Sequence, residues 1–308
     1  MLNRRTVLIA AGAALLLPAV RQAAAANAVI PLWPSKAPGG GGPKGPVQTS
    51  AKGAVSNIVM PTIEVFRPAK PSGAAMLVAG GGGYKRIEME TEARPAAQWL
   101  ADRGITAFVL SYRLPDEGWR EGPRAPLQDA QRALRLIRAR SAEYGFRPDH
   151  IGVLGFSAGG HLMGLAAARS AYRSYRAVDE VDKQPARPSA AALIYPVITL
   201  EPPYDRTSTR TVLIGRHPND EESAEWSVQP HVRSHCPPMF LVQAEDDVVS
   251  DPHNTLIMAA ACKSAGVPVE MHRLASGGHG FGMGRAGTPS AGWPEWYEAW
   301  LRKGGFLA

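Results

Sequence analysis

The sequence predicts an α/β fold, with a mostly parallel central sheet and helices on both faces. Short apolar runs alternate with helical stretches along most of the chain, which is the pattern of a parallel sheet buried on both sides. The chain has 308 residues, and 45% of them are hydrophobic. That is enough to bury such a sheet within one large domain.

The elements follow one another as strand, helix, strand. The expected strands lie at 58–66, 74–79, 105–110, 150–154, 191–195, 239–244 and 269–274, and the expected helices at 93–102, 126–144, 158–168, 254–265 and 293–301. The first strand should be partly exposed. The helix at 126–144 is amphipathic, because Leu127, Leu134 and Ile137 recur at helical spacing.

The first 26 residues are predicted to be an export signal. Arg4 and Arg5 precede an apolar run of about 14 residues, shorter than the roughly 20 of a membrane-spanning helix, and an alanine-rich stretch then offers a cleavage site. The paired arginines resemble a twin-arginine signal. We therefore expect a periplasmic or secreted protein, with no membrane span once the signal is removed.

Two other segments differ from the alternating pattern. Residues 27–54 contain a Pro- and Gly-rich stretch with consecutive glycines at 39–42, a composition that predicts a flexible leader. The main domain is then expected at 55–308. Within it, residues 199–236 interrupt the alternation of strands and helices and predict a small lid insertion.

The net charge of +7 at pH 7 is compatible with binding to nucleic acid. Without the first 26 residues, which hold three arginines and no acid, the charge is +4. The densest basic run, four arginines between 132 and 140, lies on the amphipathic helix and predicts a solvated face. No segment combines basic and aromatic residues as a nucleic-acid surface does, so we expect no nucleic-acid partner.

Residues 155–159 read Gly-Phe-Ser-Ala-Gly and lie directly between an expected strand and an expected helix. A strand, a sharp turn and a helix are what a nucleophile elbow requires, with small residues where the backbones crowd. The alternative is a serine that only caps the helix. We predict that Ser157 is a nucleophile, which needs a base to take its proton.

His279 is the predicted base among the eight histidines. It lies in a glycine-rich loop after the last expected strand, where the loop can bring the imidazole over the sheet edge. His161, four residues after Ser157 on the same helix, is expected to pack beneath the turn instead. In proteins with a nucleophile elbow the serine comes first in the chain and the histidine comes late, and Ser157 and His279 follow this order.

An acid should orient the histidine, and three aspartates follow the strand at 239–244. They are Asp246, Asp247 and Asp251. At such sites the acid lies three residues past a small residue at the strand end, and Ala244 therefore indicates Asp247. The other two remain alternatives.

Backbone N–H groups must stabilise the oxyanion. The predicted donors are Ala158, which follows the nucleophile, and Gly82 and Gly83 in the glycine run after an early strand. The alternative, a phosphate-binding loop, lacks a following Gly-Lys-Ser/Thr and any dinucleotide spacing. No cofactor is expected.

A metal site is a further alternative at His231, His235 and Cys236. Pro230 and Pro237 flank these residues, so nothing places them on a shared helical face. We expect lid or surface structure there and no metal.

With these residues identified, the chain resembles the esterase and lipase branch of the α/β-hydrolases that contains bacterial acetyl-xylan esterase-like and feruloyl-esterase-like proteins. The resemblance covers residues 60–305 and is carried by Gly81-Gly82-Gly83-Tyr84, Pro126-Leu127-Gln128-Asp129-Ala130, the segment 155–161, Tyr195-Pro196, Pro237-Pro238 and the segment 277–282. It implies the α/β-hydrolase fold, with the lid insertion, and a serine carboxylic-ester hydrolase that works through an acyl-enzyme. The expected substrates are short acyl esters, as small molecules or oligosaccharides, including acetyl groups on xylan.

Two rival functions are weighed against this one. An amidase or aminopeptidase on the same fold usually carries a substrate-limiting domain, for which this chain offers no room. A catalytically silent binding protein is disfavoured by the intact set of Ser157, Asp247 and His279. The oligomeric state stays open.

The two cysteines suggest a disulfide hypothesis. Cys236 precedes the strand at 239–244, and Cys262 lies near the end of the helix at 254–265, which should run back antiparallel to that strand. Both thiols should then lie at the same sheet edge, and export would permit a bridge. The alternative is a pair of free, buried cysteines of the ordinary core type.

Overall fold

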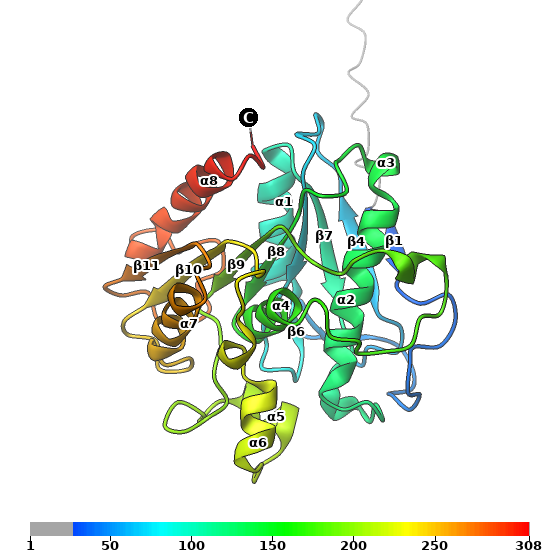
Figure 1. Cartoon of the computed structure of the whole chain (residues 1–308), viewed down its shortest axis with the longest axis horizontal. Helices are drawn as coiled ribbons and strands as arrows, with labels where there is room; N and C mark the ends of the chain where they lie inside the picture. Colours follow the sequence, from blue (N-terminus) through cyan, green and yellow to red (C-terminus); the bar gives the residue numbers. More distant parts are fainter. Residues whose placement is uncertain (1–26, 308) are drawn as a thin grey trace, which may run out of the picture.

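The computed structural model describes residues 27–307. Within that range the main sheet has eight strands in the order β1-β4-β7-β5-β8-β9-β10-β11 (Figure 1). They are β1 (Val29–Pro31), β4 (Thr62–Phe66), β5 (Ala75–Ala79), β7 (Thr106–Ser111), β8 (Ile151–Phe156), β9 (Ala190–Ile194), β10 (Met239–Ala244) and β11 (Val269–Leu274). β4 runs antiparallel to both of its neighbours, and the other adjacent strands are parallel. This confirms the predicted mostly parallel sheet.

A second, antiparallel sheet is made of β2 (Gln48–Thr49), β3 (Ala54–Ser56) and β6 (Ile87–Glu88). The α-helices are α1 (Arg94–Asp102), α2 (Arg124–Ala139), α3 (Ser141–Tyr144), α4 (Ala158–Ala168), α5 (Ser208–Ile214), α6 (Asp220–Trp226), α7 (His253–Ser264) and α8 (Trp293–Lys303). Shorter turns of helix are η1 (Met89–Ala93, of the π type), η2 (Pro115–Glu117), η3 (Glu180–Lys183), η4 (Gln229–His231) and η5 (Pro289–Gly292).

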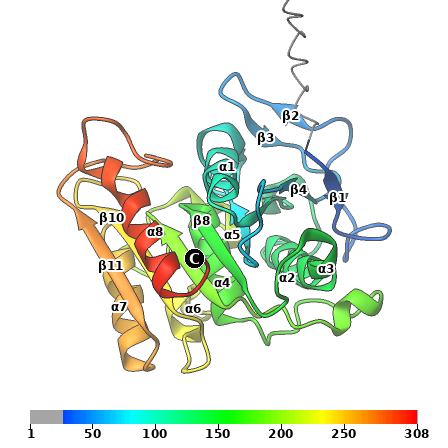
Figure 2. The same cartoon turned by 90° about the horizontal axis from the view of Figure 1, so that it is seen from above.

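Helices cover both faces of the main sheet (Figures 1 and 2). α1 and α8 lie together on one face, where the rings of Trp99 and Tyr297 stack and Arg103 pairs with Glu298 at 2.6 Å. α2, α4 and α7 cover the other face. Every residue of α4 is buried, because this helix lies directly on the central strands and is made of small and apolar residues.

The strand register brings four loops to one edge of the sheet. β5 pairs with β8 so that Ala79 lies opposite Gly155, and β10 pairs with β11 so that Ala244 lies opposite Leu274. Because these strands are parallel, the loops that follow them begin at the same edge, where α/β proteins bind their ligands. All four sequence-predicted reacting segments lie in these loops.

Residues 27–54 are ordered, and the expectation of a flexible leader is wrong. β1 pairs with β4, and the indole of Trp33 is buried and donates to Asp129 at 2.8 Å. Asp129 also pairs with the fully buried Arg113, which donates to the carbonyl of Pro38 at 2.9 Å. The segment supplies partners to a buried ion pair, and this offsets the cost of ordering its prolines and glycines.

The arginines of α2 do not form the expected solvated face. Arg132 is buried and its guanidinium pairs with Asp179 at 2.6 Å. Arg138 is also buried and donates to the carbonyl oxygens of Pro148, Pro185 and Arg187. These guanidinium groups bind internal acceptors because the loop that follows α4 folds back over α2.

The expected lid, residues 199–236, contains α5, α6 and η4, and α5 and α6 lie together below the sheet in Figure 1. The expected export signal, residues 1–26, lies outside the described residues. Between residues 27 and 307, no helix has both the length and the apolar character needed to cross a membrane.

Both cysteines are free and buried, so the hypothesised bridge is absent from this structure. The Cys236 sulfur accepts the N–H of Arg233, whereas the Cys262 sulfur lies 3.5 Å from the sulfur of Met239. Burial, with a smaller effect from Cys236, raises the pKa of the Cys262 thiol to about 12 and keeps it protonated.

Thiol titration of the denatured, unreduced protein should therefore give two free thiols per chain. Each sulfur has its own partner in the folded core, and the raised thiol pKa of Cys262 slows its oxidation. The same titration after reduction is the control. A count that rises from zero to two on reduction would contradict the structure.

Candidate active site

Ser157 occupies a strained turn between β8 and α4. Its backbone has φ 50° and ψ −118°, a conformation that non-glycine residues rarely adopt. The flanking glycines permit the turn, since a Cβ on Gly155 would lie 2.2 Å from the Gly159 carbonyl oxygen. A Cβ on Gly159 would lie 2.3 Å from the carbonyl oxygen of Ala79. Close backbone approach therefore explains the Gly-x-Ser-x-Gly pattern.

His279 connects Ser157 to an acid. Its Nε2 lies 2.8 Å from Ser157 Oγ, and its Nδ1 lies 2.7 Å from Asp247 Oδ2. With Nδ1 donating to the carboxylate, Nε2 is free to accept the serine hydroxyl proton. The structure thus brings the three sequence-predicted residues into one hydrogen-bonded chain.

The Asp247 carboxylate is buried and receives three further hydrogen bonds. The N–H groups of Val249 and Ser250 donate to Oδ1 at 2.8 and 2.9 Å, and the Gln243 amide donates to Oδ2 at 2.8 Å. These donors offset the loss of water around the charge and fix its direction toward His279. Gln243 was not predicted, because it lies within an apolar strand without a recognisable motif.

The alternative acids lie elsewhere. Asp246 is exposed and accepts the N–H of Gly278 at 2.8 Å, so it supports the histidine loop without touching the imidazole. Asp251 contacts the Nδ1 of His253 at 2.7 Å on the surface. The spacing argument from Ala244 therefore selected the aspartate that contacts His279.

His161 is fully buried beneath the elbow, as expected. Its Nδ1 lies 3.0 Å from the hydroxyl of Tyr84, and its Nε2 lies 2.7 Å from the Trp226 carbonyl oxygen. Burial lowers the pKa of His161 to about 4, so it is neutral near pH 7. It connects the glycine loop after β5 to the carboxyl end of α6.

The glycine loop after β5 packs against Ser157. A Cβ on Gly81 would lie 2.8 Å from the Cβ of Ser157. Gly82 and Gly83 have φ 112° and 63°, and between residues 27 and 307 their N–H groups find no acceptor. The N–H of Ala158 is one of the free donors at the start of α4. None of the three predicted donors therefore has an acceptor within residues 27–307.

Residues 63–261 match the model of the BD-FAE family. The chain belongs to the BD-FAE family. It is 32% identical over 224 residues to an acetylxylan esterase of Xylanibacter ruminicola, which corresponds to 71% of this chain and 43% of that protein. It is 34% identical over 212 residues to endo-1,4-beta-xylanase B of Butyrivibrio fibrisolvens, or 67% of this chain and 32% of that protein. The chain therefore spans less than half the length of these curated relatives.

Solved structures confirm the α/β-hydrolase fold of this BD-FAE chain. The crystal structure of the acetyl ester-xyloside bifunctional hydrolase from Caldicellulosiruptor lactoaceticus matches with a TM-score of 0.78 and 33% identity, over 92% of this chain and 98% of that one. A thermophilic esterase from Thermogutta terrifontis, with propionate bound, matches with a TM-score of 0.65 and 25% identity, over 85% and 95%.

Two of the three alternative metal residues of the BD-FAE chain, His231 and Cys236, are engaged in other contacts. His231 Nε2 lies 2.7 Å from the carbonyl oxygen of Glu225, and the Cys236 sulfur accepts a backbone N–H. In the part of the chain that the structure describes, no group of three or more His, Cys, Asp or Glu side chains could hold a metal ion.

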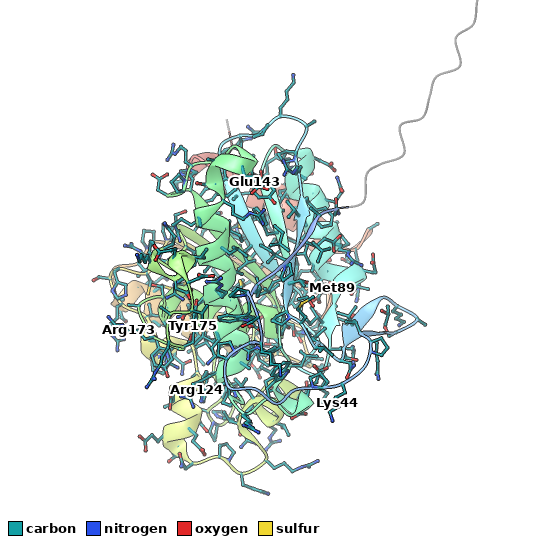
Figure 3. All side chains as sticks on the ribbon, turned by 90° about the vertical axis from the view of Figure 1, so that its right-hand side faces the viewer. Lys44, Met89, Arg124, Glu143, Arg173 and Tyr175 are labelled. Atoms are coloured by element: carbon teal, nitrogen blue, oxygen red, sulfur yellow. The ribbon has the colours of Figure 1, made fainter. Side chains whose placement is uncertain are left out.

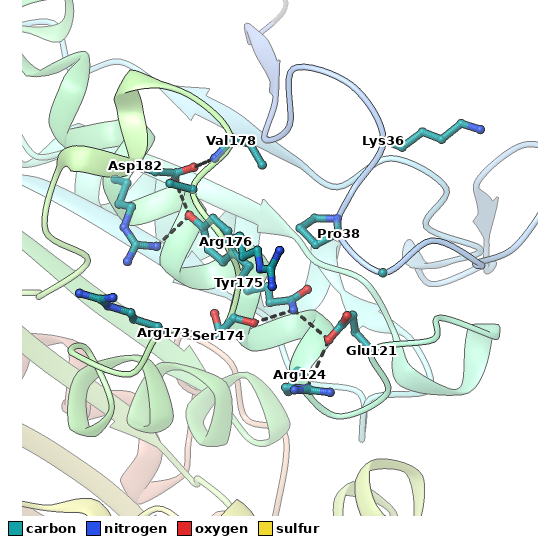
Figure 4. A pocket seen from close by; sticks show the side chains of 14 residues that line it. Lys36, Pro38, Glu121, Arg124, Arg173, Ser174, Tyr175, Arg176, Val178 and Asp182 are labelled. Atoms are coloured by element: carbon teal, nitrogen blue, oxygen red, sulfur yellow. Dashed lines mark hydrogen bonds and ion pairs between the residues drawn. The ribbon is translucent and has the colours of Figure 1, made fainter.

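A cavity of about 940 Å³ lies on the face shown in Figure 3, where Arg124, Arg173 and Tyr175 are labelled. Figure 4 shows that these side chains come from α2 and from the loop after α4. None of Ser157, Asp247 and His279 lines this cavity. The hydrogen-bonded chain, and not the size of a cavity, therefore locates the candidate active site of this BD-FAE protein.

Proposed function

We propose that this BD-FAE protein is a serine carboxylic-ester hydrolase that works through an acyl-enzyme. The observation that carries the proposal is the chain of hydrogen bonds from Asp247 through His279 to Ser157, beside a loop with free N–H groups. A nucleophile, a base, an orienting acid and oxyanion donors are the parts that acyl transfer requires.

In the first half of the reaction, Ser157 Oγ attacks the ester carbonyl carbon while His279 Nε2 takes the hydroxyl proton. The negative charge on the carbonyl oxygen is stabilised by the N–H groups of Gly82, Gly83 and Ala158. When the tetrahedral intermediate collapses, its bond to the alcohol oxygen breaks. The imidazolium, stabilised by Asp247, then donates its proton to the leaving alcohol.

In the second half, water replaces the alcohol. His279 Nε2 takes a proton from the water as its oxygen attacks the acyl-Ser157 carbonyl, and the same N–H groups hold the second oxyanion. Collapse breaks the bond to Ser157 Oγ, which recovers its proton from the imidazolium. The carboxylic acid leaves, and the enzyme returns to its starting state.

Acetyl groups on carbohydrates such as xylan are the proposed substrates. Two relatives support this choice by their names, an acetylxylan esterase and an acetyl ester-xyloside hydrolase. The lid crowds the site, because a Cβ on Gly83 would lie 2.2 Å from the hydroxyl of Ser208 on α5. The lid also carries charged residues, including Arg206, Arg210, Asp220, Glu221 and Glu222. A crowded, charged lid favours a short acyl group.

A p-nitrophenyl ester series should show higher kcat/KM for acetyl than for octanoyl esters, by about tenfold or more, because the longer chain must be fitted beside the lid. Release of acetate from acetylated xylan should accompany this preference. Protein with Ser157→Ala is the control for uncatalysed hydrolysis. Faster turnover of octanoyl than of acetyl esters would indicate a lipase-like enzyme instead.

A further inference from the structure

A buried carboxyl group lies between the two loops that carry the reacting groups, and the mechanism above does not use it. Glu92, in η1, is 4% exposed. Its Oε2 accepts the N–H of Gly81 at 2.6 Å, and its Oε1 accepts the hydroxyl of Tyr195 at 3.0 Å. The Tyr195 oxygen in turn accepts the N–H of Gly282 at 3.0 Å.

Each end of this network lies beside a reacting group. Gly81 packs against the Cβ of Ser157 and immediately precedes the two glycines with free N–H groups. At the other end, Gly282 lies three residues after His279. The ring of Tyr195 packs edge-on against the His279 imidazole, with centroids 4.9 Å apart. The Glu92 carboxyl therefore connects the oxyanion loop to the histidine loop.

We propose that Glu92 is a positioning residue that holds the oxyanion loop and the His279 loop in their catalytic geometry. The proposal rests on the proposed esterase function. One carboxylate oxygen fixes the orientation of the peptide that leads into Gly82, and the other fixes the Tyr195 hydroxyl against the His279 loop. Such control matters because a shift of about 1 Å in a reacting group can cost about 10²-fold in rate.

The ionised form of Glu92 suits this network. The Gly81 N–H and the Tyr195 hydroxyl both donate to the carboxyl, and the ionised form accepts from each more strongly than the protonated form does. Burial is the main cause that raises the pKa of Glu92 to about 7; the charge of Glu88 raises it further, and the bonds from Gly81 and Tyr195 oppose the shift.

The other titratable groups around Glu92 keep it sensitive near neutral pH. The charge of His279 lowers the pKa of Glu92, but less than burial raises it. Burial also raises the pKa values of the Tyr112 and Tyr195 phenols, which stay neutral and can only donate or accept hydrogen bonds. As the pH falls through about 7, Glu92 takes up a proton and the connection between the loops weakens.

Glu92 affects the free energy of unfolding and the activity in opposite directions as the pH rises. Because its folded-state pKa is raised, its contribution to stability is fully present below the ordinary carboxyl pKa and is lost as pH rises through about 7. Above that pH the folded wild-type protein holds the buried charge of Glu92. The neutral side chain in Glu92→Gln removes the desolvation cost of that charge. A loss of activity in Glu92→Gln would then not follow from a loss of folding.

The test measures p-nitrophenyl acetate hydrolysis across the pH range around 7 for the wild type, Glu92→Gln and Tyr195→Phe. Glu92→Gln should lower kcat about 10²-fold with little change in KM, because the oxyanion donors act in the transition state. Tyr195→Phe should act in the same direction. The double variant should lose less than the product of the single losses, since both changes break one network.

The pH profile separates positioning from a merely structural role. On the acid side, the fall of wild-type kcat should include the protonation of Glu92, which Glu92→Gln lacks, so the profile of Glu92→Gln should be less steep near pH 7. Matched controls are Glu90→Gln, an exposed glutamate in the same turn of helix, and Tyr297→Phe, a buried tyrosine on α8. Both controls should keep the wild-type profile.

Wild-type kcat in Glu92→Gln would overturn the role of Glu92 and leave the esterase function intact. So would a kcat loss that follows a fall in melting temperature while the pH profile keeps its wild-type shape. If Glu92→Gln does not fold, Tyr195→Phe decides by kcat and melting temperature, because it removes only the hydroxyl that donates to the carboxyl. Wild-type kcat in a folded Tyr195→Phe protein would then overturn the role of Glu92. A wild-type protein that neither hydrolyses the ester nor reacts with a fluorophosphonate overturns both the function and the role of Glu92.

Discussion

Ser157→Ala should lower kcat for p-nitrophenyl acetate by about 10⁴-fold or more, because loss of the nucleophile removes the covalent route altogether. Among the described residues 27–307, the hydroxyl hydrogen-bonds only to the His279 Nε2, at 2.8 Å, so its removal breaks no bond that holds the fold. The free energy of unfolding should change by no more than about 1 kcal/mol. Steady-state kinetics and urea unfolding measure the two quantities.

Ser189→Ala is the matched control for this change. Its hydroxyl donates to the carbonyl of Ile151, at the opposite end of β8 from the elbow. This variant should keep wild-type kcat and labelling by a fluorophosphonate, whereas Ser157→Ala should lose both. A Ser157→Ala protein that keeps a tenth of wild-type turnover would show that another residue is the nucleophile.

Asp247→Asn should lower kcat by about 10⁴-fold, since an amide no longer holds the imidazole in the tautomer that leaves Nε2 free to accept a proton. The carboxylate contacts His279 Nδ1 at 2.7 Å and is fixed by three other donors. Asn at this position presents either its oxygen or its amide to Nδ1, and neither stabilises the imidazolium as a carboxylate does.

Asp246→Asn provides the comparison for Asp247→Asn in the same loop. Asp246 is exposed and accepts the N–H of Gly278, so its replacement should cost less than about tenfold in kcat. Kinetics of the two variants at one pH decide the assignment. Equal losses, or a larger loss in Asp246→Asn, would mean that Asp247 is not the orienting acid.

Local patterns in the sequence predicted the elements that carry the site. The bounds of α4, β10 and β11 agree with the prediction. The small residues of α4 and the largely apolar run of β10 specify buried elements directly, whereas β11 mixes apolar and charged residues and is only partly buried. The reacting side chains could be selected for the same reason. Ser157 and Asp247 lie at fixed short distances from strand ends, and His279 lies directly after the last strand.

The contacts of buried polar groups could not be predicted in this way. Glu92 carries no motif, and its role depends on Gly81 and Tyr195, the second of which is 103 residues away. The same holds for Trp33, whose indole reaches Asp129 across 96 residues and orders a segment with the composition of a flexible linker. Local sequence specifies helices, strands and turns because those depend on near neighbours. Whether a charged or polar side chain is buried depends on partners that only the folded chain brings together.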